Sequence, residues 1–266
     1  MQLFKYSQDR LPVALFAAYF LCDLVVYARA RGVAVLLAWF LLGILPKAWI
    51  CAWNHNHQHV PPFRHALLNR LLTLMYGFQT GAITNLWVLH HVLGHHRHYL
   101  DPRRDQNRWR RVDGTPMSLL EYTVNITVTS YPRALRVGRK FRRQRRVLLL
   151  SGLLTLLMLG AALYCRPMPA LFVFVLPMAL SLVLTGMNTY YQHFGLATRD
   201  PLAASYNVTH RWFNILTGNM GYHTAHHFRP GVHWSRLPAL HRSLEGRIPR
   251  ELLLKAGAPY SWLGPD

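Results

Sequence analysis

Residues 147–164 (VLLLSGLLTLLMLGAALY) contain no charged side chain, and after the short link 165–167 neither do residues 168–187 (MPALFVFVLPMALSLVLTGM). An α-helix rises about 1.5 Å per residue, so segments of about 18 to 20 residues reach roughly 27–30 Å, the thickness of a bilayer's hydrocarbon core. We therefore predict two membrane-spanning helices that form a hairpin.

A second apolar pair lies nearer the amino terminus. Residues 11–28 contain one charge, Asp23, and residues 32–50 contain Lys47, with the link 29–31 between them. Buried helices of a soluble protein are the alternative for all four segments, but four runs in two close pairs favour transmembrane hairpins. Ala28-Arg29-Ala30 resembles a signal-peptide cleavage site. Because Asp23 interrupts the apolar run and a second run follows at once, we interpret 11–28 as a span.

Composition supports a membrane protein. Of the 266 residues, 52% are hydrophobic and only 15% are charged, against about 25% charged in soluble domains. A chain this apolar is not expected to be disordered. Its three cysteines (Cys22, Cys51 and Cys165) lack the close spacing of a disulfide scaffold.

Basic residues indicate the orientation. Lys and Arg number 30 against 10 acidic residues, and they concentrate in residues 53–146, which hold 16, and 188–266, which hold 8. The positive-inside rule places both polar regions and both chain termini in the cytoplasm. The run RKFRRQRR at 139–146 could bind nucleic acid, but its position directly before an uncharged span favours contact with phospholipid, and we expect no nucleic-acid partner.

One further apolar stretch, residues 66–89, contains several polar residues and glycines that make a spanning helix costly. A crossing there would also separate two histidine clusters onto opposite membrane faces. We interpret it as an interfacial or re-entrant helix pair, and expect residues 118–131 to lie on the membrane surface in a similar way.

The 16 histidines outnumber the acidic residues, and most fall into clusters. The clusters are HNHQH at 55–59, HHVLGHHRH at 90–98 and HTAHH at 223–227, while His193 stands alone six residues after the fourth span. Residues three and four apart share one face of a helix, so each cluster can present several imidazoles together.

Neutral imidazoles bind metal ions through one ring nitrogen. The hairpin topology places all three clusters and His193 on one membrane face. Eight or nine imidazoles suit two metal ions better than one. Imidazole binds zinc, copper, iron and nickel, so the ligand type alone does not select the metal.

The order and spacing of the clusters resemble the membrane fatty-acid desaturase/hydroxylase superfamily, the integral-membrane non-haem di-iron oxygenases. Its signature of H-x(3–4)-H, H-x(2–3)-HH and (H/Q)-x(2–3)-HH matches HNHQH at 55–59, HVLGHH at 91–96 and HTAHH at 223–227. The resemblance covers nearly the whole chain. It implies an all-α integral membrane protein, a single domain over 1–266 with four transmembrane helices in two hairpins, interfacial helices and a cytoplasmic histidine-rich cap that holds two metal ions.

The resemblance also implies the ligands. Two iron ions would be held by His55, His59, His91, His95, His96, His193, His223, His226 and His227. Asn188, five residues before His193, is the nearest candidate for an asparagine that completes the shell through water. We expect His57 to support a ligand or lie in solvent. His90 and His98 flank the second cluster and either could orient a ligand, but exposed cytoplasmic positions are favoured. Asp101, Asp105 and Asp113 either hydrogen-bond to ligand imidazoles or solvate an arginine-rich loop.

The implied activity is the oxidation of a fatty-acyl or other lipid chain by O2, with desaturation as the leading reaction. Hydroxylation, carotenoid ketolation, alkane oxidation and decarboxylation to a terminal alkene stay open. Two electrons are expected from a separate ferredoxin-, rubredoxin- or cytochrome b5-like donor, because the chain shows no further redox centre. The non-enzymatic alternative is a histidine-rich metal transporter or store, which the absence of histidine from the spans disfavours.

Overall fold

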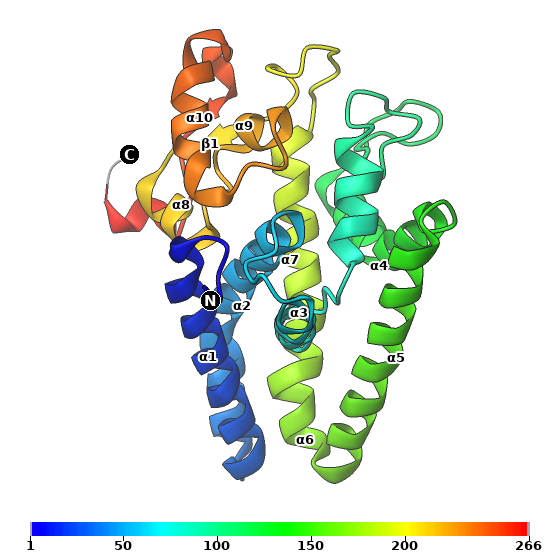
Figure 1. Ribbon diagram of the computed structural model, residues 1–266, viewed down its shortest axis with the longest axis vertical. Coiled ribbons are helices and arrows are strands. Elements are labelled where there is room, and N and C mark those ends of the chain that lie inside the picture. Colours follow the sequence, from blue (N-terminus) through cyan, green and yellow to red (C-terminus); the bar gives the residue numbers. More distant parts are fainter. Residues whose placement is uncertain (1, 265–266) are drawn as a thin grey trace. The chain divides into compact units, whose positions relative to one another are not determined.

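A computed structural model describes residues 2–264, and these form two compact units (Figure 1). Unit 1 comprises the chain up to Trp87 together with Gly138–Thr185, and unit 2 comprises Val88–Val137 together with the chain from Gly186 onward. Each unit is therefore built from two separate chain segments. The expectation of one domain over 1–266 stays a prediction.

Unit 1 contains the long apolar helices. Its elements are η1 (Ser7–Asp9), α1 (Arg10–Arg29), α2 (Val33–His59), α3 (Ala66–Thr80), α5 (Arg142–Cys165), α6 (Pro167–Ala170), η3 (Leu171–Val175) and the first part of α7 (Leu176–His193). Within residues 2–264, four segments are long and apolar enough to cross a membrane: Ser7–Arg29, Val33–His59, Arg142–Cys165 and Pro167–His193. These coincide with the four predicted spans, as expected of a multi-pass membrane protein. The hairpin arrangement and the cytoplasmic placement stay predictions.

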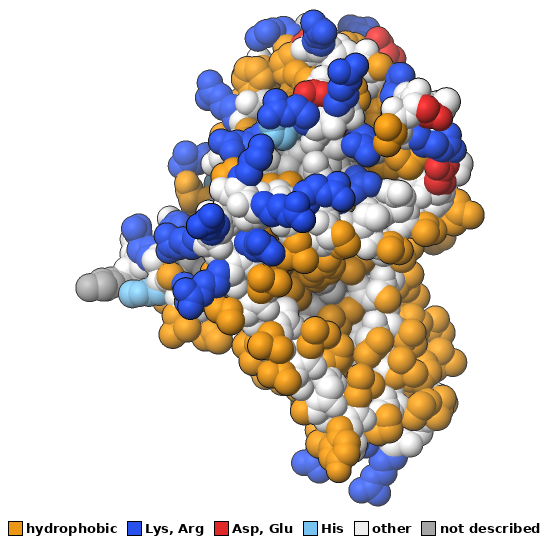
Figure 2. All heavy atoms as spheres, turned by 90° about the vertical axis from the view of Figure 1, so that its right-hand side faces the viewer, with side chains coloured by type: hydrophobic (Ala, Val, Ile, Leu, Met, Phe, Trp, Pro, Cys, Tyr) orange, Lys and Arg blue, Asp and Glu red, His pale blue; other side chains and the backbone are white. Residues whose placement is uncertain are grey.

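The outer surface of these helices is apolar. Leu42 on α2 is 77% exposed and Leu156 on α5 is 68% exposed. Hydrophobic side chains cover α5 and its surroundings in Figure 2. Exposed leucines in such numbers would cause aggregation in water, whereas hydrocarbon chains of a bilayer can cover them without cost.

The two charges inside the first pair of spans neutralise one another. Lys47 Nζ lies 2.9 Å from Asp23 Oδ2, and it also donates to the backbone carbonyl of Val173 in the π-helical turn η3. The indole of Trp39 donates to the other carboxylate oxygen at 2.9 Å. Both charged side chains are buried, so each spanning charge has the partners that its burial requires.

The stretch 66–89 differs from the predicted helix pair. It contains one helix, α3, which ends at Gly81 in the left-handed conformation (φ 72°). A Cβ atom at this position would lie 2.7 Å from the carbonyl oxygen of Met178, so only glycine fits the turn. The next helix, η2 (Val88–His96), begins at the end of the stretch and carries the second histidine cluster. Membrane contact of α3 stays a prediction.

Unit 2 is built around η2, α4 (Leu119–Val137) and the last turns of α7, followed by a region of short elements. That region contains β1 (Asn207–Val208), α8 (Arg211–Thr217), α9 (His223–Phe228), η4 (Trp234–Arg236), α10 (Leu237–Leu244), η5 (Glu245–Arg247), η6 (Arg250–Leu252), β2 (Leu253–Leu254) and η7 (Tyr260–Leu263). β1 and β2 pair in parallel. One apolar core packs α9 against α10 through Ala225 and Leu237, and another packs α4 against α7 through Tyr122 and Tyr190.

Candidate metal centre

The first histidine cluster forms the end of α2. This helix continues beyond the apolar span, so that the cluster lies in its last two turns. His55 and His59 are one α-helical turn apart on the same side, and their ring centroids are 4.6 Å apart. His57 points to a different side, where its Nδ1 lies 2.8 Å from the hydroxyl oxygen of Tyr76 on α3.

The second cluster lies in a π-helix rather than the expected α-helix. In η2 the backbone bonds connect residues five apart, and therefore His91 and His96 become neighbours. Their Nε2 atoms are 2.9 Å apart and their rings 4.4 Å apart. His95 stays close as well, with its ring 5.1 Å from that of His91. The wider helix thus gathers three imidazoles where an α-helix would align two.

The last ligand candidates come from α7 and α9. His193 is the final residue of α7, and α9 is a short helix made almost entirely of the third cluster. Within α9, His223 and His227 are one turn apart and their Nε2 atoms lie 3.2 Å from each other. His226 lies on the adjacent side of this short helix, close to His96.

Seven of the nine predicted ligands converge within unit 2 in two groups. The ligating atoms of His91, His96 and His226 lie within 4.8 Å of one another, and so do those of His95, His193 and His227. His223 joins the second group, because its Nε2 is 3.1 Å from that of His193. The two groups adjoin, since the rings of His96 and His227 stack at 4.2 Å. The other two ligands, His55 and His59, are side by side in unit 1.

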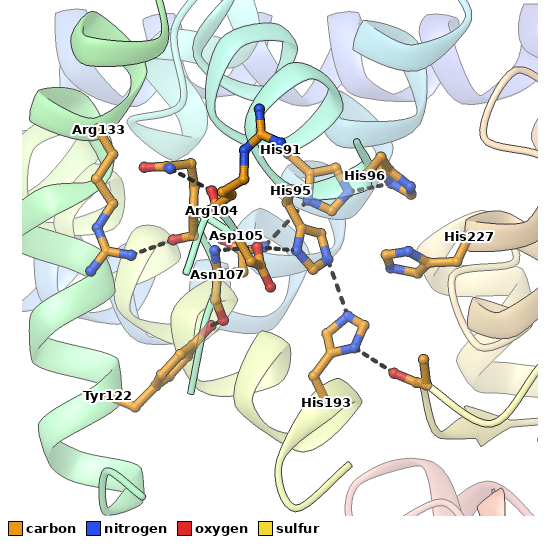
Figure 3. Close-up of polar contacts among 12 residues, drawn as sticks. His91, His95, His96, Arg104, Asp105, Asn107, Tyr122, Arg133, His193 and His227 are labelled. Atoms are coloured by element: carbon orange, nitrogen blue, oxygen red, sulfur yellow. Dashed lines mark hydrogen bonds and ion pairs between the residues drawn. The ribbon is translucent and has the colours of Figure 1, made fainter. Parts of the chain in front are cut away.

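Hydrogen bonds on the far side of two rings determine which nitrogen carries a lone pair. His95 Nδ1 lies 2.6 Å from the carboxylate of Asp105, and His193 Nδ1 lies 2.9 Å from the carbonyl oxygen of Ala204. Both partners only accept hydrogen bonds, so each Nδ1 carries a proton, and the neutral tautomer of each ring then has its lone pair on Nε2. These two Nε2 atoms face each other at 3.2 Å (Figure 3). Two lone pairs at this distance repel unless a cation lies between them.

The spacing fits a metal ion. Imidazole nitrogens bind zinc at about 2.0–2.1 Å, and two such nitrogens on one tetrahedral or octahedral ion are about 2.9–3.4 Å apart. The Nε2–Nε2 distances within the two groups include 2.9, 3.0, 3.1 and 3.2 Å. The donor set therefore suits transition metals that accept nitrogen ligands, among which geometry and imidazole chemistry leave iron, zinc, copper and nickel.

The pKa values of residues in and beside the two histidine groups favour the binding of a cation. Burial, and then the neighbouring imidazoles, lowers the pKa of His227 well below its ordinary value, so this ring is neutral at physiological pH. For Asp105, burial raises the pKa, but the attraction and hydrogen bond of His95 and the backbone N–H of Asn107 outweigh it, and the net pKa is lowered. Asp105 therefore stays ionised beside the cluster.

The loop that follows η2 supports the second cluster. Asp105 is buried against His95, and Asn107 places its side-chain amide 3.5 Å from His91 Nδ1 (Figure 3). The hydroxyl of Tyr122 donates to the carbonyl of Asn107, and Arg133 donates to the carbonyl of Gln106. Helix α4 thus fixes the loop that orients the ligands. Of the three candidate aspartates, Asp105 alone contacts a ligand in the described residues; Asp101 and Asp113 accept backbone hydrogen bonds within the loop.

Several predictions about neighbouring residues were wrong. His90 is 1% exposed rather than solvated, because the π-helix turns it inward, and burial lowers its pKa to about 3. His57 is buried, which removes the solvated alternative and agrees with the other one, support of a ligand. Asn188 is exposed on α7, since five residues in an α-helix place it away from the side of His193. His98 is half-buried.

Sequence reasoning also missed residues beside the cluster. The ring of Tyr99 lies 4.4 Å from that of His227, and Asn107 approaches His91. Asp9, far upstream of every cluster, contacts His57 with its Oδ1 3.4 Å from Nε2. The sequence offered one indication for Tyr99 and Asn107, namely that they follow the second cluster closely along the chain. It offered no indication for Asp9.

The geometry agrees with a known family. A protein-family model described as "Fatty acid desaturase" matches residues 31–262, which is most of the chain. The chain belongs to the fatty acid desaturase family. No curated protein and no solved structure matches it significantly.

Membership of this family agrees with a shared metal-binding role for the histidine clusters. The three histidine boxes of this desaturase-family protein lie on α2, η2 and α9, within the matched residues. The family consists of oxidoreductases that act on fatty-acyl chains in membranes, which agrees with four spanning helices and with histidines grouped for metal binding.

Proposed function

We propose that this protein is an O2-dependent di-iron enzyme that introduces a double bond into a fatty-acyl chain of a membrane lipid. The observation that carries the proposal is the convergence of imidazole Nε2 atoms in two adjoining groups, exemplified by His95 and His193 at 3.2 Å. Two bound iron ions would supply the chemistry that activates O2 and removes hydrogen from an unactivated C–H bond.

The nine histidines divide naturally between two ions. His95, His193, His223 and His227 would hold one iron, and their Nε2 atoms already approach one another at about 3 Å. His91, His96 and His226 would hold the other, with His55 and His59 as its remaining ligands. The family membership and the H-x3-H spacing of the last pair support its inclusion.

The protein's own residues prepare this centre. Asp105 and the carbonyl of Ala204 keep the protons of His95 and His193 on Nδ1, which leaves the Nε2 lone pair for the metal. The apolar surface of the spans gives a lipid chain access from the bilayer. The concentration of basic residues in the polar regions supports a cytoplasmic location of the centre, by the positive-inside rule. A separate ferredoxin-, rubredoxin- or cytochrome b5-like donor would deliver two electrons per turnover.

The test combines metal analysis with product analysis. Expression in a host that lacks the new product, followed by gas chromatography of its lipids, should reveal a double bond, and the purified protein should hold about two irons. His226→Ala should reduce the product at least about a hundredfold, whereas His98→Ala, a histidine of the same region outside both groups, should leave product and iron intact.

Other outcomes discriminate among the alternatives. A hydroxylated, ketolated or alkene product would retain the di-iron centre and replace desaturation. Protein that holds zinc alone and consumes no O2 with a reductant would instead indicate metal transport or storage. Equal product from His226→Ala and the unsubstituted protein would remove the catalytic assignment of the third box.

A further inference from the structure

The middle histidine of the first box has no place in the proposed ligand set. His57 lies between His55 and His59 in sequence. Residues two apart in an α-helix point in directions about 200° apart, so the side chain of His57 points away from those of His55 and His59. It is 1% exposed, and its two ring nitrogens approach the hydroxyl of Tyr76 at 2.8 Å and the carboxylate of Asp9 at 3.4 Å.

The three side chains form one buried polar chain in unit 1. Asp9 ends η1, His57 is on α2 and Tyr76 is on α3, and neither Asp9 nor Tyr76 has measurable exposure. The carboxylate of Asp9 faces Nε2 as an ion-pair contact and favours a ring proton on that nitrogen. The unprotonated Nδ1 then accepts a hydrogen bond from the hydroxyl group of Tyr76. The centroid of the Phe16 ring lies 6.1 Å from that of Tyr76.

These three side chains hold α2 close to its end, and the orientation of that end determines where His55 and His59 point. The first box occupies the final turns of the helix, where backbone carbonyls lack partners and helices fray. A ring nitrogen of His55 or His59 lies roughly 6 Å from the helix axis, so a rotation of the end by about 20° displaces it by about 2 Å. A ligand of a metal ion tolerates only about 0.2 Å.

We infer that Asp9, His57 and Tyr76 act as positioning residues that fix the rotation of the end of α2 and so aim His55 and His59 at their metal ion. This inference rests on the proposed function, since it assumes that His55 and His59 are ligands. It assigns the central histidine of the box to the support of the site rather than to the metal, and it makes an aspartate far from every box necessary for metal retention.

The test uses the full-length protein in detergent with three single variants. Asp9→Asn removes the charge and keeps the shape, His57→Gln replaces the ring, and Tyr76→Phe removes only the hydroxyl. We expect Asp9→Asn and His57→Gln each to lower bound iron about tenfold under competition with a chelator, and Tyr76→Phe less. The double variant Asp9→Asn/His57→Gln should lose no more iron than His57→Gln alone, because both changes break one chain.

A second readout separates aiming from stability. Protein loaded with Co2+ should show a changed visible d–d spectrum in all three variants. The matched control is Asp23→Asn/Lys47→Met, which removes another buried polar contact of α1 and α2 in the same unit. This control should shift the unfolding temperature while iron content and the Co2+ spectrum stay unchanged.

The outcomes are distinct. Folded Asp9→Asn and Tyr76→Phe proteins with normal iron and a normal Co2+ spectrum would overturn the inference, and so would equal iron loss from the Asp23/Lys47 control. If the unsubstituted protein binds Co2+ but yields no oxidised lipid, the proposed reaction fails, while an altered Co2+ spectrum in the variants would still support the positioning role.

Discussion

The end of α2 and the π-helix η2 present histidines with the same H-x3-H spacing, but they do so differently. On α2 the α-helical turn aligns His55 with His59 and directs His57 to another side. On η2 the wider turn brings His96 beside His91 while His95 stays in contact. The α-helix therefore aligns two predicted ligands and turns the histidine between them to another side, whereas the π-helix gathers three predicted ligands.

The difference also determines what holds each segment in place. A π-helix is rarely stable without tertiary contacts, and the loop after η2 supplies them. The backbone N–H of Gln106 donates to the carbonyl of Gly94 at 3.3 Å, and Asp105 bonds to His95. The end of α2 instead depends on residues of other helices, Tyr76 and Asp9. Substitutions that weaken metal binding by η2 are therefore expected in the loop directly after it, whereas those that weaken metal binding by the end of α2 are expected in distant segments.

The largest effect should follow from a side chain at Gly94. A Cβ atom there would lie 2.6 Å from the Cγ atom of Gln106 and 3.1 Å from the carbonyl oxygen of Leu89, so the supporting loop must move away from η2. We expect Gly94→Val to reduce bound iron and lipid product at least about a hundredfold, because His91, His95 and His96 are displaced together.

Gly160→Val is the matched control for this substitution. Gly160 lies on α5, and a Cβ atom added there would meet no other described atom within 4 Å, so the same change should leave iron and product within about twofold. Normal iron content in Gly94→Val would show that close packing of the loop is unnecessary for η2 to present its ligands.

A smaller effect should follow from Asp105→Asn. The substitution keeps the size of the side chain but removes the acceptor that fixes the proton of His95 on Nδ1. Partners of this kind contribute about 10- to 100-fold to metal affinity, so the dissociation constant for Co2+ or Fe2+, measured by competition with a chelator, should rise by that factor.

Asp101→Asn provides the comparison within the same loop. Its carboxylate accepts a hydrogen bond from the backbone of Arg103, a residue outside the ligand set. Its metal affinity should stay within about twofold of the unsubstituted protein. If both aspartates lowered affinity equally, the negative charge of the loop rather than the contact with His95 would be responsible.

The sequence predicted the spans and the histidine clusters better than it predicted the residues that support these clusters. Hydropathy located the four helices, but α2 continues past residue 50 because a polar helix end carries no hydropathy signal. The π-helix η2 was not predicted, because the residue types of an α-helix and of a π-helix are the same and the sequence does not show the wider turn. The burial of His90 was not predicted, because burial of a polar ring depends on partners from other elements. Asp9 shows the limit most clearly: its contact with His57 joins segments that no local pattern connects.

The smallest effect concerns acid and distinguishes the surroundings of α9 from the end of α2. His241 on α10 is 2% exposed and packs its ring 4.9 Å from that of Tyr222, beside the third box. Burial, opposed in part by Glu245, lowers the pKa of His241 below its ordinary value of about 6.5. As the pH falls below about 6.5, His241 therefore becomes protonated in the unfolded chain while it stays neutral in the folded protein. Stability declines until the pH reaches the lower folded-state pKa.

His241→Phe should remove this contribution while keeping the ring contact with Tyr222. Between pH 7.5 and 5.5 the unfolding temperature of the variant should fall less than that of the unsubstituted protein, by an amount corresponding to at most about 1.4 kcal/mol per pH unit. Protonation of the ligand histidines affects both proteins alike and cancels in the comparison. Equal acid sensitivity of the two proteins would mean that water or a charged partner reaches His241, and that the packing of α10 on α9 is looser than its burial indicates.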